Sequence, residues 1–195
     1  MDEAEKLADI FARSAALKTR VAAEHAAGML AMVGVIADCL AAGGKVFFCG
    51  NGGSAADAQH LATELLVRLR GGVERPSWPA IALTLDPAAL SAGGNDYGFE
   101  MVFARPLSGL GRAGDVLVAI TTSGRSPNVV RALEAAAALG IRRLGLLGGS
   151  GHPAAGLCEH AIVVPSSETA RVQETHITIG HALLELVEDR LVGRS

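Results

Sequence analysis

Apolar residues recur at helical spacing near the start of the chain. Leu7 and Phe11, for example, stand one helical turn apart, and this spacing predicts helix over residues 3–42. We expect two helices in this stretch, broken near Leu17–Lys18. Their end is predicted at Gly43–Gly44, because glycine commonly closes a helix. The chain therefore begins with a helical extension.

Short runs that are apolar on both faces alternate with helical segments in the rest of the chain. Such strands, separated by helices, predict a parallel sheet covered by helices on both sides. We expect one α/β domain over residues 1–195, with a helical extension and a three-layer core. The extension covers 1–42, the core 43–195, the predicted strands 45–49, 79–83, 115–120, 143–147 and 160–164, and the predicted core helices 55–69, 127–139 and 168–191.

Composition narrows the class of protein. A chain of 195 residues with 50% hydrophobic residues is large enough for one sizeable core, and 19% charged residues argue against disorder. The net charge of -3 and the scattered lysines and arginines argue against nucleic-acid binding, which usually needs a basic stripe. We therefore expect a globular protein that does not bind nucleic acid.

Cysteine usage and the N-terminus favour a cytoplasmic protein without a membrane partner. The three cysteines, Cys39, Cys49 and Cys158, are an odd number without C-x-x-C spacing. That fits neither a disulfide framework nor a structural zinc site, so we interpret them as buried thiols. The first residues lack the basic start and apolar run of a signal peptide. The apolar stretch 26–42 contains Asp38 and is shorter than a typical span of about 20 residues, so we expect it in a core or a subunit interface.

A glycine-rich turn, Cys49–Ser54, follows the first predicted strand. In parallel sheets ligands bind beyond the carboxyl ends of the strands, and the helix that follows this turn directs free amides at that space. Glycines also permit close approach of the backbone to a ligand. Taken alone, the turn is equally well explained by tight packing.

A second turn, Thr121–Asn128, follows the third predicted strand and contains four hydroxyls within six positions. Ser126 suits a helix N-cap and Pro127 the first helical position, but capping does not explain the preceding run of hydroxyls. Hydroxyls and free amides together make a phosphate-binding site without a lysine. Neither turn fits the P-loop or the dinucleotide fingerprint, so the two turns favour a phosphate ester over a nucleotide.

Two pairs of polar residues lie on predicted helices. His60 and Glu64 are four residues apart on one helix face, while Gln173 and His181 lie toward one side of the last helix. A carboxylate and an imidazole beside a phosphate site can move protons, and the four residues together suit a divalent metal, although glutamine is an uncommon ligand. Spacing alone also allows a surface ion pair and a satisfied histidine. Glu174 and His176 are expected to point elsewhere.

Four motifs in order resemble those of the sugar-isomerase (SIS) domain family and, more closely, the bacterial phosphoheptose isomerases. They cover nearly the whole chain, and they are Cys49–His60, Gly94–Gly98, Thr122–Asn128 and Arg171–His176. The resemblance implies a flavodoxin-like, five-stranded parallel sheet and a homotetramer with active sites between subunits. It also implies a role for the helical extension in oligomerisation.

The resemblance also implies roles for individual residues. Glu64 would be the catalytic base and His181 the acid, and zinc would be held by His60, Glu64, Gln173 and His181. Substrate contacts would come from the two turns, from Asp96 and from Gln173. The turn residues are Asn51, Gly52, Gly53, Ser54, Thr121, Thr122, Ser123 and Ser126.

Two positions depart from the family pattern. Thr121 stands where serine is frequent, and it keeps the hydroxyl, so phosphate binding should survive. Ala170 stands where some members have an aspartate, so any help from that carboxylate must come from elsewhere, with Thr169 as the nearest polar candidate.

The resemblance implies isomerisation of sedoheptulose 7-phosphate to D-glycero-D-manno-heptose 7-phosphate through an enediol, the first step toward activated heptose and lipopolysaccharide. One alternative is a related non-enzymatic branch that binds the replication initiator, but that branch lacks acid–base residues at the positions of Glu64 and His181. A sugar-phosphate-sensing regulator would usually carry an added DNA-binding domain. An isomerase of another sugar phosphate remains open at this point.

Overall fold

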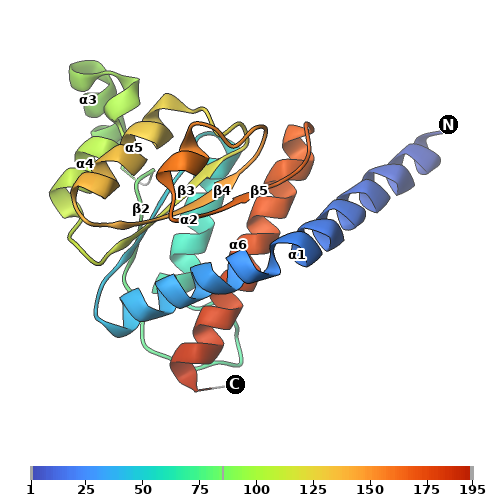
Figure 1. Ribbon diagram of the computed structural model, residues 1–195, viewed down its shortest axis with the longest axis horizontal. Coiled ribbons are helices and arrows are strands. Elements are labelled where there is room, and N and C mark those ends of the chain that lie inside the picture. The colour runs from blue at the N-terminus through green and yellow to red at the C-terminus, as the bar shows by residue number, and fades with distance from the viewer. Residues whose placement is uncertain (1, 85, 194–195) are drawn as a thin grey trace.

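A computed structural model describes residues 2–84 and 86–193, and it has three layers, with a parallel sheet between two sets of helices (Figure 1). All five predicted strands are present, which confirms the predicted fold class. In chain order the elements are α1 (Glu3–Ala41), β1 (Val46–Cys49), α2 (Gly53–Leu66), β2 (Ala80–Ala82), α3 (Pro87–Tyr97), η1 (Phe99–Met101), α4 (Ala104–Leu110), β3 (Val116–Thr121), α5 (Pro127–Ala138), β4 (Arg142–Leu147), η2 (Ala154–Leu157), β5 (His160–Val163) and α6 (Thr169–Val192).

The strand order is β2-β1-β3-β4-β5, and every pairing is parallel. Phe47 of β1 lies level with Ile81 of β2 on one side and Leu117 of β3 on the other. The strand order therefore reverses at β1 and β3, which is the point where open α/β sheets form a crevice beyond the carboxyl ends of their strands. Both polar turns predicted from the sequence begin at this crevice.

The sheet separates two apolar cores. Val46 and Phe48 of β1 face a core shared with α1, α2 and α6, whereas Phe47 and Cys49 face a core shared with α4 and α5. Alternate residues of a strand point to opposite faces, so a strand buried on both sides must be apolar throughout. This explains the unbroken apolar runs in the sequence.

The first helix differs from its prediction. α1 runs without interruption for 39 residues, so the expected break at Leu17–Lys18 is wrong. Neither residue disfavours helix, and this part of the chain has no proline or glycine to end one. Asp2 and Glu5 form a reciprocal capping box that fixes the start of the helix.

The sequence pattern also missed four short elements, namely α3, η1, α4 and η2. α3 and η1 bury no residue, so they lack the periodic apolar face that signals a helix. Asp86 caps α3 and Pro87 occupies its first turn, so local chemistry rather than core packing starts this helix.

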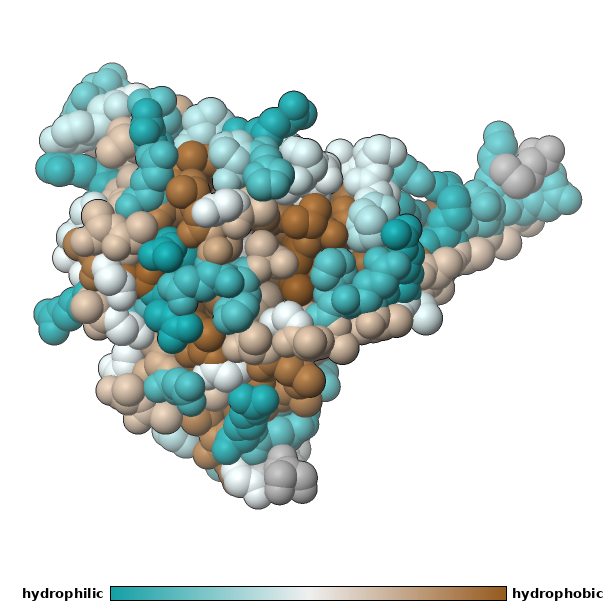
Figure 2. All heavy atoms as spheres, viewed as in Figure 1, coloured by the Kyte–Doolittle hydropathy of each residue, from teal (hydrophilic) through white to brown (hydrophobic). Residues whose placement is uncertain are grey.

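α1 extends beyond the body of the molecule (Figure 1). Leu7, Phe11 and Leu30 are exposed on it, while most residues between Met32 and Leu40 are buried. Figure 2 shows polar side chains along one edge of this arm and moderately apolar ones along the other. By length and composition α1 is apolar enough to cross a membrane, a test that buried core helices also pass.

A buried ion pair holds the C-terminal end of α2 against α6. Arg75 donates from Nε to Glu188 at 2.9 Å, and the two side chains are 1% and 0% exposed. The same guanidinium donates to the carbonyls of Glu64 and Leu65, which have no partner within the helix, and Arg70 donates to the second oxygen of Glu188 at 2.5 Å. One arginine therefore caps α2 and joins it to α6.

We predict that Glu188→Ala lowers the free energy of unfolding by about 3–5 kcal/mol, because it leaves the Arg75 guanidinium buried without its counter-charge. Urea unfolding followed by circular dichroism measures the loss. Asp189→Ala is the matched control, since Asp189 is partly exposed and, among the described residues, forms an ion pair with Arg70 alone, and it should cost less than about 1 kcal/mol. Equal losses in the two variants would contradict this account.

His176 fixes the N-terminal half of α6 to the end of β4. Its side chain is fully buried, and its Nε2 lies 3.0 Å from the carbonyl oxygen of Leu147, so this nitrogen must carry the proton and donate it. Burial disfavours the imidazolium and lowers the pKa of His176 to about 4.

We predict that stability falls as the pH is lowered from about 6.5 to 4, because over that range the unfolded chain takes up a proton on His176 that the folded protein excludes. Between pH 7 and 5 this group alone should remove about 2 kcal/mol of unfolding free energy. His176→Gln keeps a donor for the Leu147 carbonyl but does not titrate. Between pH 7 and 5 the unfolding free energy of this variant should therefore fall by about 2 kcal/mol less than that of the wild-type protein. An identical decline in both proteins would refute the assignment.

Candidate active site

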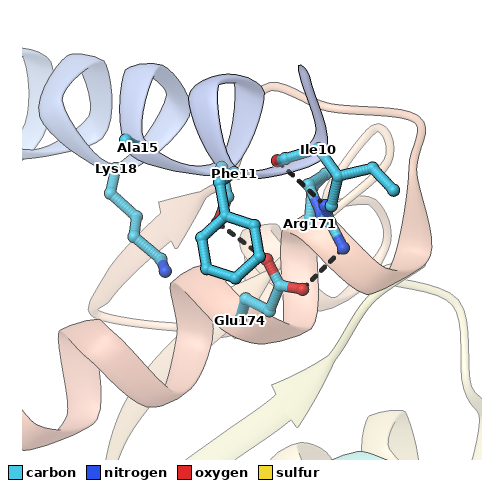
Figure 3. Close-up of a pocket in the computed structure, with 7 residues that line it drawn as sticks. Ile10, Phe11, Ala15, Lys18, Arg171 and Glu174 are labelled. Carbon is cyan, nitrogen blue, oxygen red and sulfur yellow. Dashed lines mark hydrogen bonds and ion pairs between the residues drawn. The ribbon is translucent and has the colours of Figure 1, made fainter. Parts of the chain in front are cut away.

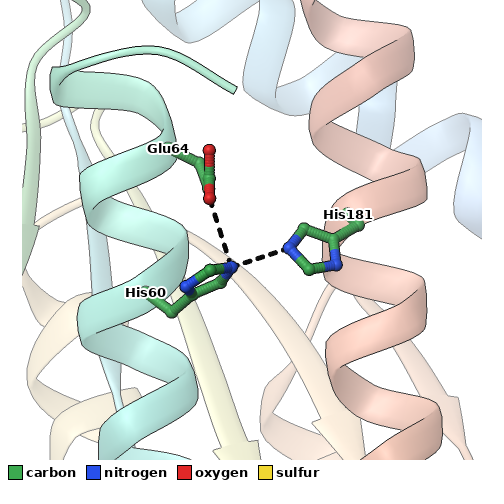
Figure 4. Close-up of side chains that lie close together, drawn as sticks. All are labelled: His60, Glu64 and His181. Carbon is green, nitrogen blue, oxygen red and sulfur yellow. Dashed lines mark hydrogen bonds and ion pairs between the residues drawn. The ribbon is translucent and has the colours of Figure 1, made fainter. Parts of the chain in front are cut away.

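Three predicted site residues meet between α2 and α6 (Figure 4). His60 Nε2 lies 2.7 Å from His181 Nε2 and 3.2 Å from Glu64 Oε1. The two imidazole rings are 4.9 Å apart and nearly perpendicular, so their nitrogens face each other edge-on. The geometry therefore brings one carboxylate and two imidazoles to a single point.

Local structure explains how these side chains meet. His60 and Glu64 are separated by one turn of α2 and share a face, as their spacing predicts. His181 reaches them because α6 passes close to α2 at Gly180, where a Cβ would come within 2.7 Å of the Leu61 side chain. The lack of a side chain at Gly180 therefore lets the helices approach closely enough for the cluster to form.

The cluster has the donor set of a divalent metal site. Its imidazole nitrogens and carboxylate oxygen all lie within 4.8 Å of one another, and this combination suits zinc. Glu64 is 16% exposed and His60 48% exposed, so the site is open on the His60 side. The residues present thus fit an ion that keeps one position for an outside ligand.

Gln173, the fourth predicted ligand, lies at a different level along the axis of α2 from the other three. Its amide rests on the first turn of α2, where a Cβ on Gly53 would come within 1.9 Å of Nε2. Gly53 precedes His60 by seven residues, which is about 10 Å along a helix axis. The structure therefore brings His60, Glu64 and His181 together and leaves Gln173 at the glycine-rich turn.

The two polar turns are joined by a pair of side-chain amides. Asn51 and Asn128 each donate to the other's carbonyl oxygen at 2.8 Å, and Asn128 is buried. Asn51, predicted to contact substrate, is thus also the connection between the first turn and the start of α5. Residues 98–100 close one side of a hollow of about 460 Å³ beside this pair.

Hydroxyl groups gather at the second turn. Thr121 Oγ1 lies 2.9 Å from Ser126 Oγ and 3.4 Å from Ser123 Oγ. Ser126 occupies the N-cap position of α5, but its hydroxyl makes no capping bond, so capping does not explain its presence. Gly124 permits the tight turn, because it has φ of +69° and a Cβ there would lie 2.4 Å from the backbone of Gly151.

The other predicted residues are distributed as follows. Gly52 precedes the first turn of α2 with φ of +56°, Ser54 is buried within that turn, and Thr122 is partly buried beside the clustered hydroxyls. Asp96 lies on α3, accepts from Asn95 at 2.7 Å and lines a separate hollow. Within one chain, Asp96 therefore joins neither the phosphate-binding turns nor the His60 cluster.

Glu174 and His176 point away from the cluster, as predicted. Glu174 accepts from Ser14 of α1 at 2.7 Å and from Arg171 at 2.6 Å, beside a hollow lined by Phe11 (Figure 3). His176 is directed at the sheet. These two residues thus serve the packing of α6 on its neighbours.

Asp57, which was not among the predicted site residues, lies on the same face of α2 as His60 and Glu64. Asp57 is 9% exposed, and its Oδ2 is buried without a hydrogen-bond partner among the described residues. Burial raises the pKa of Asp57, while His60 and His181 oppose that shift. The spacing of residues 57, 60 and 64 is a helical-face signal that would have identified it.

Residues 10–148 match the SIS domain family. A phosphoheptose isomerase of Pelodictyon phaeoclathratiforme is 53% identical over 190 residues, which are 97% of this chain and 90% of that protein.

Two solved structures agree with this match. A phosphoheptose isomerase of Neisseria gonorrhoeae has a TM-score of 0.88 at 40% identity, over 96% of this chain and 100% of that one. A phosphoheptose isomerase from Francisella tularensis has a TM-score of 0.91 at 37% identity, over 97% of this chain and 100% of that one. The similarity thus extends over the α1 arm, the sheet and the α2–α6 cluster alike.

Proposed function

Because the chain belongs to the phosphoheptose isomerase family of SIS-domain proteins, we propose that it interconverts sedoheptulose 7-phosphate and D-glycero-D-manno-heptose 7-phosphate. Membership confirms the resemblance that the four motifs predicted, and the protein is a sugar-phosphate isomerase. The observation that supports this reaction best is the convergence of Glu64 and His181 along α2, the helix that begins at the first of the turns suited to phosphate.

The residues suggest a division of labour along the substrate. Free amides at the start of α2 and the hydroxyls of Thr121, Ser123 and Ser126 bind the phosphate. Glu64 removes a proton from C1 of the open-chain ketose, which forms the enediol, and returns it to C2. His181 moves the proton between the two oxygens, so that the carbonyl passes from C2 to C1.

Zinc is the proposed cofactor. His60, Glu64 and His181 would hold it, and Gln173 would need to turn away from Gly53 to join them. Zinc held there would polarise substrate oxygens and stabilise the negative charge that develops on them. Glu64 would then serve both as a ligand and as the proton carrier.

A cytoplasmic homotetramer is the proposed assembly, with its active sites between subunits. The exposed apolar residues of α1 support it, because Leu7 and Phe11 gain stability only when another surface covers them. The proposed domain division consists of an extension of residues 1–42 and a core of residues 43–195, and its boundary lies next to the end of α1 at Ala41. Residues 1, 85, 194 and 195 of that domain lie outside the described part of the chain.

We predict that Glu64→Gln lowers kcat at least about 100-fold, because the amide cannot carry the proton between the carbons. Conversion of sedoheptulose 7-phosphate to the aldose, followed by NMR, measures this loss. Binding of the phosphate ester, measured by calorimetry, should change little, since the turns are unaltered. Wild-type rates in the variant would remove Glu64 from the mechanism, and no conversion by the wild-type protein would refute the proposed reaction.

We also predict that the protein binds about one zinc ion per subunit and that His60→Ala weakens this binding at least about 10-fold. Metal content after dialysis against a chelator and re-addition of zinc gives the measurement, independently of turnover. His152→Ala is the control, because His152 is exposed on the loop after β4. Equal zinc binding by both variants would contradict the site.

A further inference from the structure

A hollow of about 280 Å³ lies between α2 and α6, next to the cluster of His60, Glu64 and His181. Four of its lining residues come from α6 and one, Asp57, comes from α2. Those on α6 are Ala170, Gln173, Glu174 and Ile177. The hollow begins at the level of the glycine-rich turn, because Gln173 also touches Gly53.

Among the described residues that line this hollow, Asp57 carries the one buried side-chain oxygen that no hydrogen bond satisfies. Glu174 already accepts hydrogen bonds from Ser14 and Arg171, and the Gln173 amide rests on Gly53. Asp57 Oδ2 is buried and has no partner among the described residues. Leaving a buried carboxylate oxygen without a hydrogen bond is costly, so the site favours a partner that arrives from outside the chain.

None of the described residues that line the hollow is basic, so a fixed ion pair does not supply that partner. Thr169, the substitute expected for the aspartate absent at Ala170, is exposed and does not line it either. The small side chain of Ala170 instead leaves space opposite Asp57. Neutral hydroxyl groups fit such a site, because they donate to a carboxylate without adding charge.

The position of Asp57 matches the middle of the substrate. Gly53, at the phosphate end, precedes Asp57 by about 6 Å along the helix axis, and Glu64, at the reacting end, follows it by about 10 Å. An open-chain sugar phosphate that spans these two ends must pass Asp57. Its central carbons carry hydroxyls and nothing else that is polar.

We propose that Asp57 binds hydroxyl groups of the open-chain sugar between its phosphate and its reacting carbons, and that it thereby selects long polyhydroxylated substrates. This inference rests on the proposed function, because it assumes a sugar phosphate in the crevice. Asp57 is then a specificity-determining residue: it holds the central part of the chain while Glu64 and His181 act on one end.

The experiment measures binding without turnover. The ligands are a heptitol 7-phosphate, which keeps the phosphate and hydroxyls but lacks a carbonyl, and its 4-deoxy and 5-deoxy analogues. Calorimetry on the full-length zinc-loaded protein compares wild type, Asp57→Ala and Asp57→Asn. We expect Asp57→Ala to weaken binding of the parent ligand about 10- to 100-fold, as for a hydrogen bond to a charged group.

The decisive result is whether the effect of Asp57→Ala on binding depends on the presence of one particular hydroxyl group of the ligand. Asp57→Ala should weaken at least one deoxy analogue less than about 3-fold, because that ligand has already lost the hydroxyl concerned. Asp57→Asn keeps the shape and an acceptor, so its loss with the parent ligand should be smaller than that of Asp57→Ala. Glu174→Gln is the matched control in the same hollow and should weaken the parent and both analogues equally.

Two outcomes would overturn the inference. Equal weakening of the parent and both deoxy ligands by Asp57→Ala would show that Asp57 acts through the fold, and reduced zinc content in Asp57→Asn would make it part of the metal site. Turnover of sedoheptulose 7-phosphate by the wild-type protein is measured in parallel. If the wild-type protein turns over its substrate and either of these outcomes is found, only the role of Asp57 is refuted. If the wild-type protein neither turns over the substrate nor binds the heptitol phosphate, the proposed function is refuted as well.

Discussion

The contact between α2 and α6 is the constraint on which the candidate site depends. His60 and Glu64 stand on one helix and His181 on the other, so a change in helix spacing moves His181 away from the other two side chains. Two features fix that spacing: Gly180 permits the close approach, and the buried Arg75–Glu188 pair holds the C-terminal ends together. A buried ion pair contributes little net stability, but it defines one geometry because misplacing either charge is costly.

The second constraint is the position where the strand order reverses. Parallel strands β1 and β3 end side by side, so their turns must share one crevice, and the Asn51–Asn128 amide pair ties them together. α2 starts in that crevice and carries the acid–base residues farther along its length. The helix therefore sets the distance between phosphate and reacting carbons, which is a physical basis for selecting substrate length.

Residue patterns predicted what short-range physics determines. Apolar runs identified the five strands, and helical spacing placed His60 with Glu64. Residue spacing predicted which side of a helix each side chain faces, but not whether side chains on two helices lie at the same level along the axis. Gln173 and His181 were therefore assigned to one site although eight residues of helix separate them. The Arg75–Glu188 pair joins residues far apart in the chain, which no local pattern encodes, and the false break at Leu17–Lys18 arose where no residue opposes helix.

The proposed assembly and the proposed chemistry have a common physical reason. Proton transfer through an enediol benefits from a site that excludes water, because solvent competes for the charges that develop. In a single chain the cluster is open on the side of His60, which is 48% exposed, while Glu64 is largely covered. The apolar surface of the α1 arm is also uncovered. A second copy that covers both would gain hydrophobic stabilisation and close the site in the same step, so assembly and activity should depend on each other.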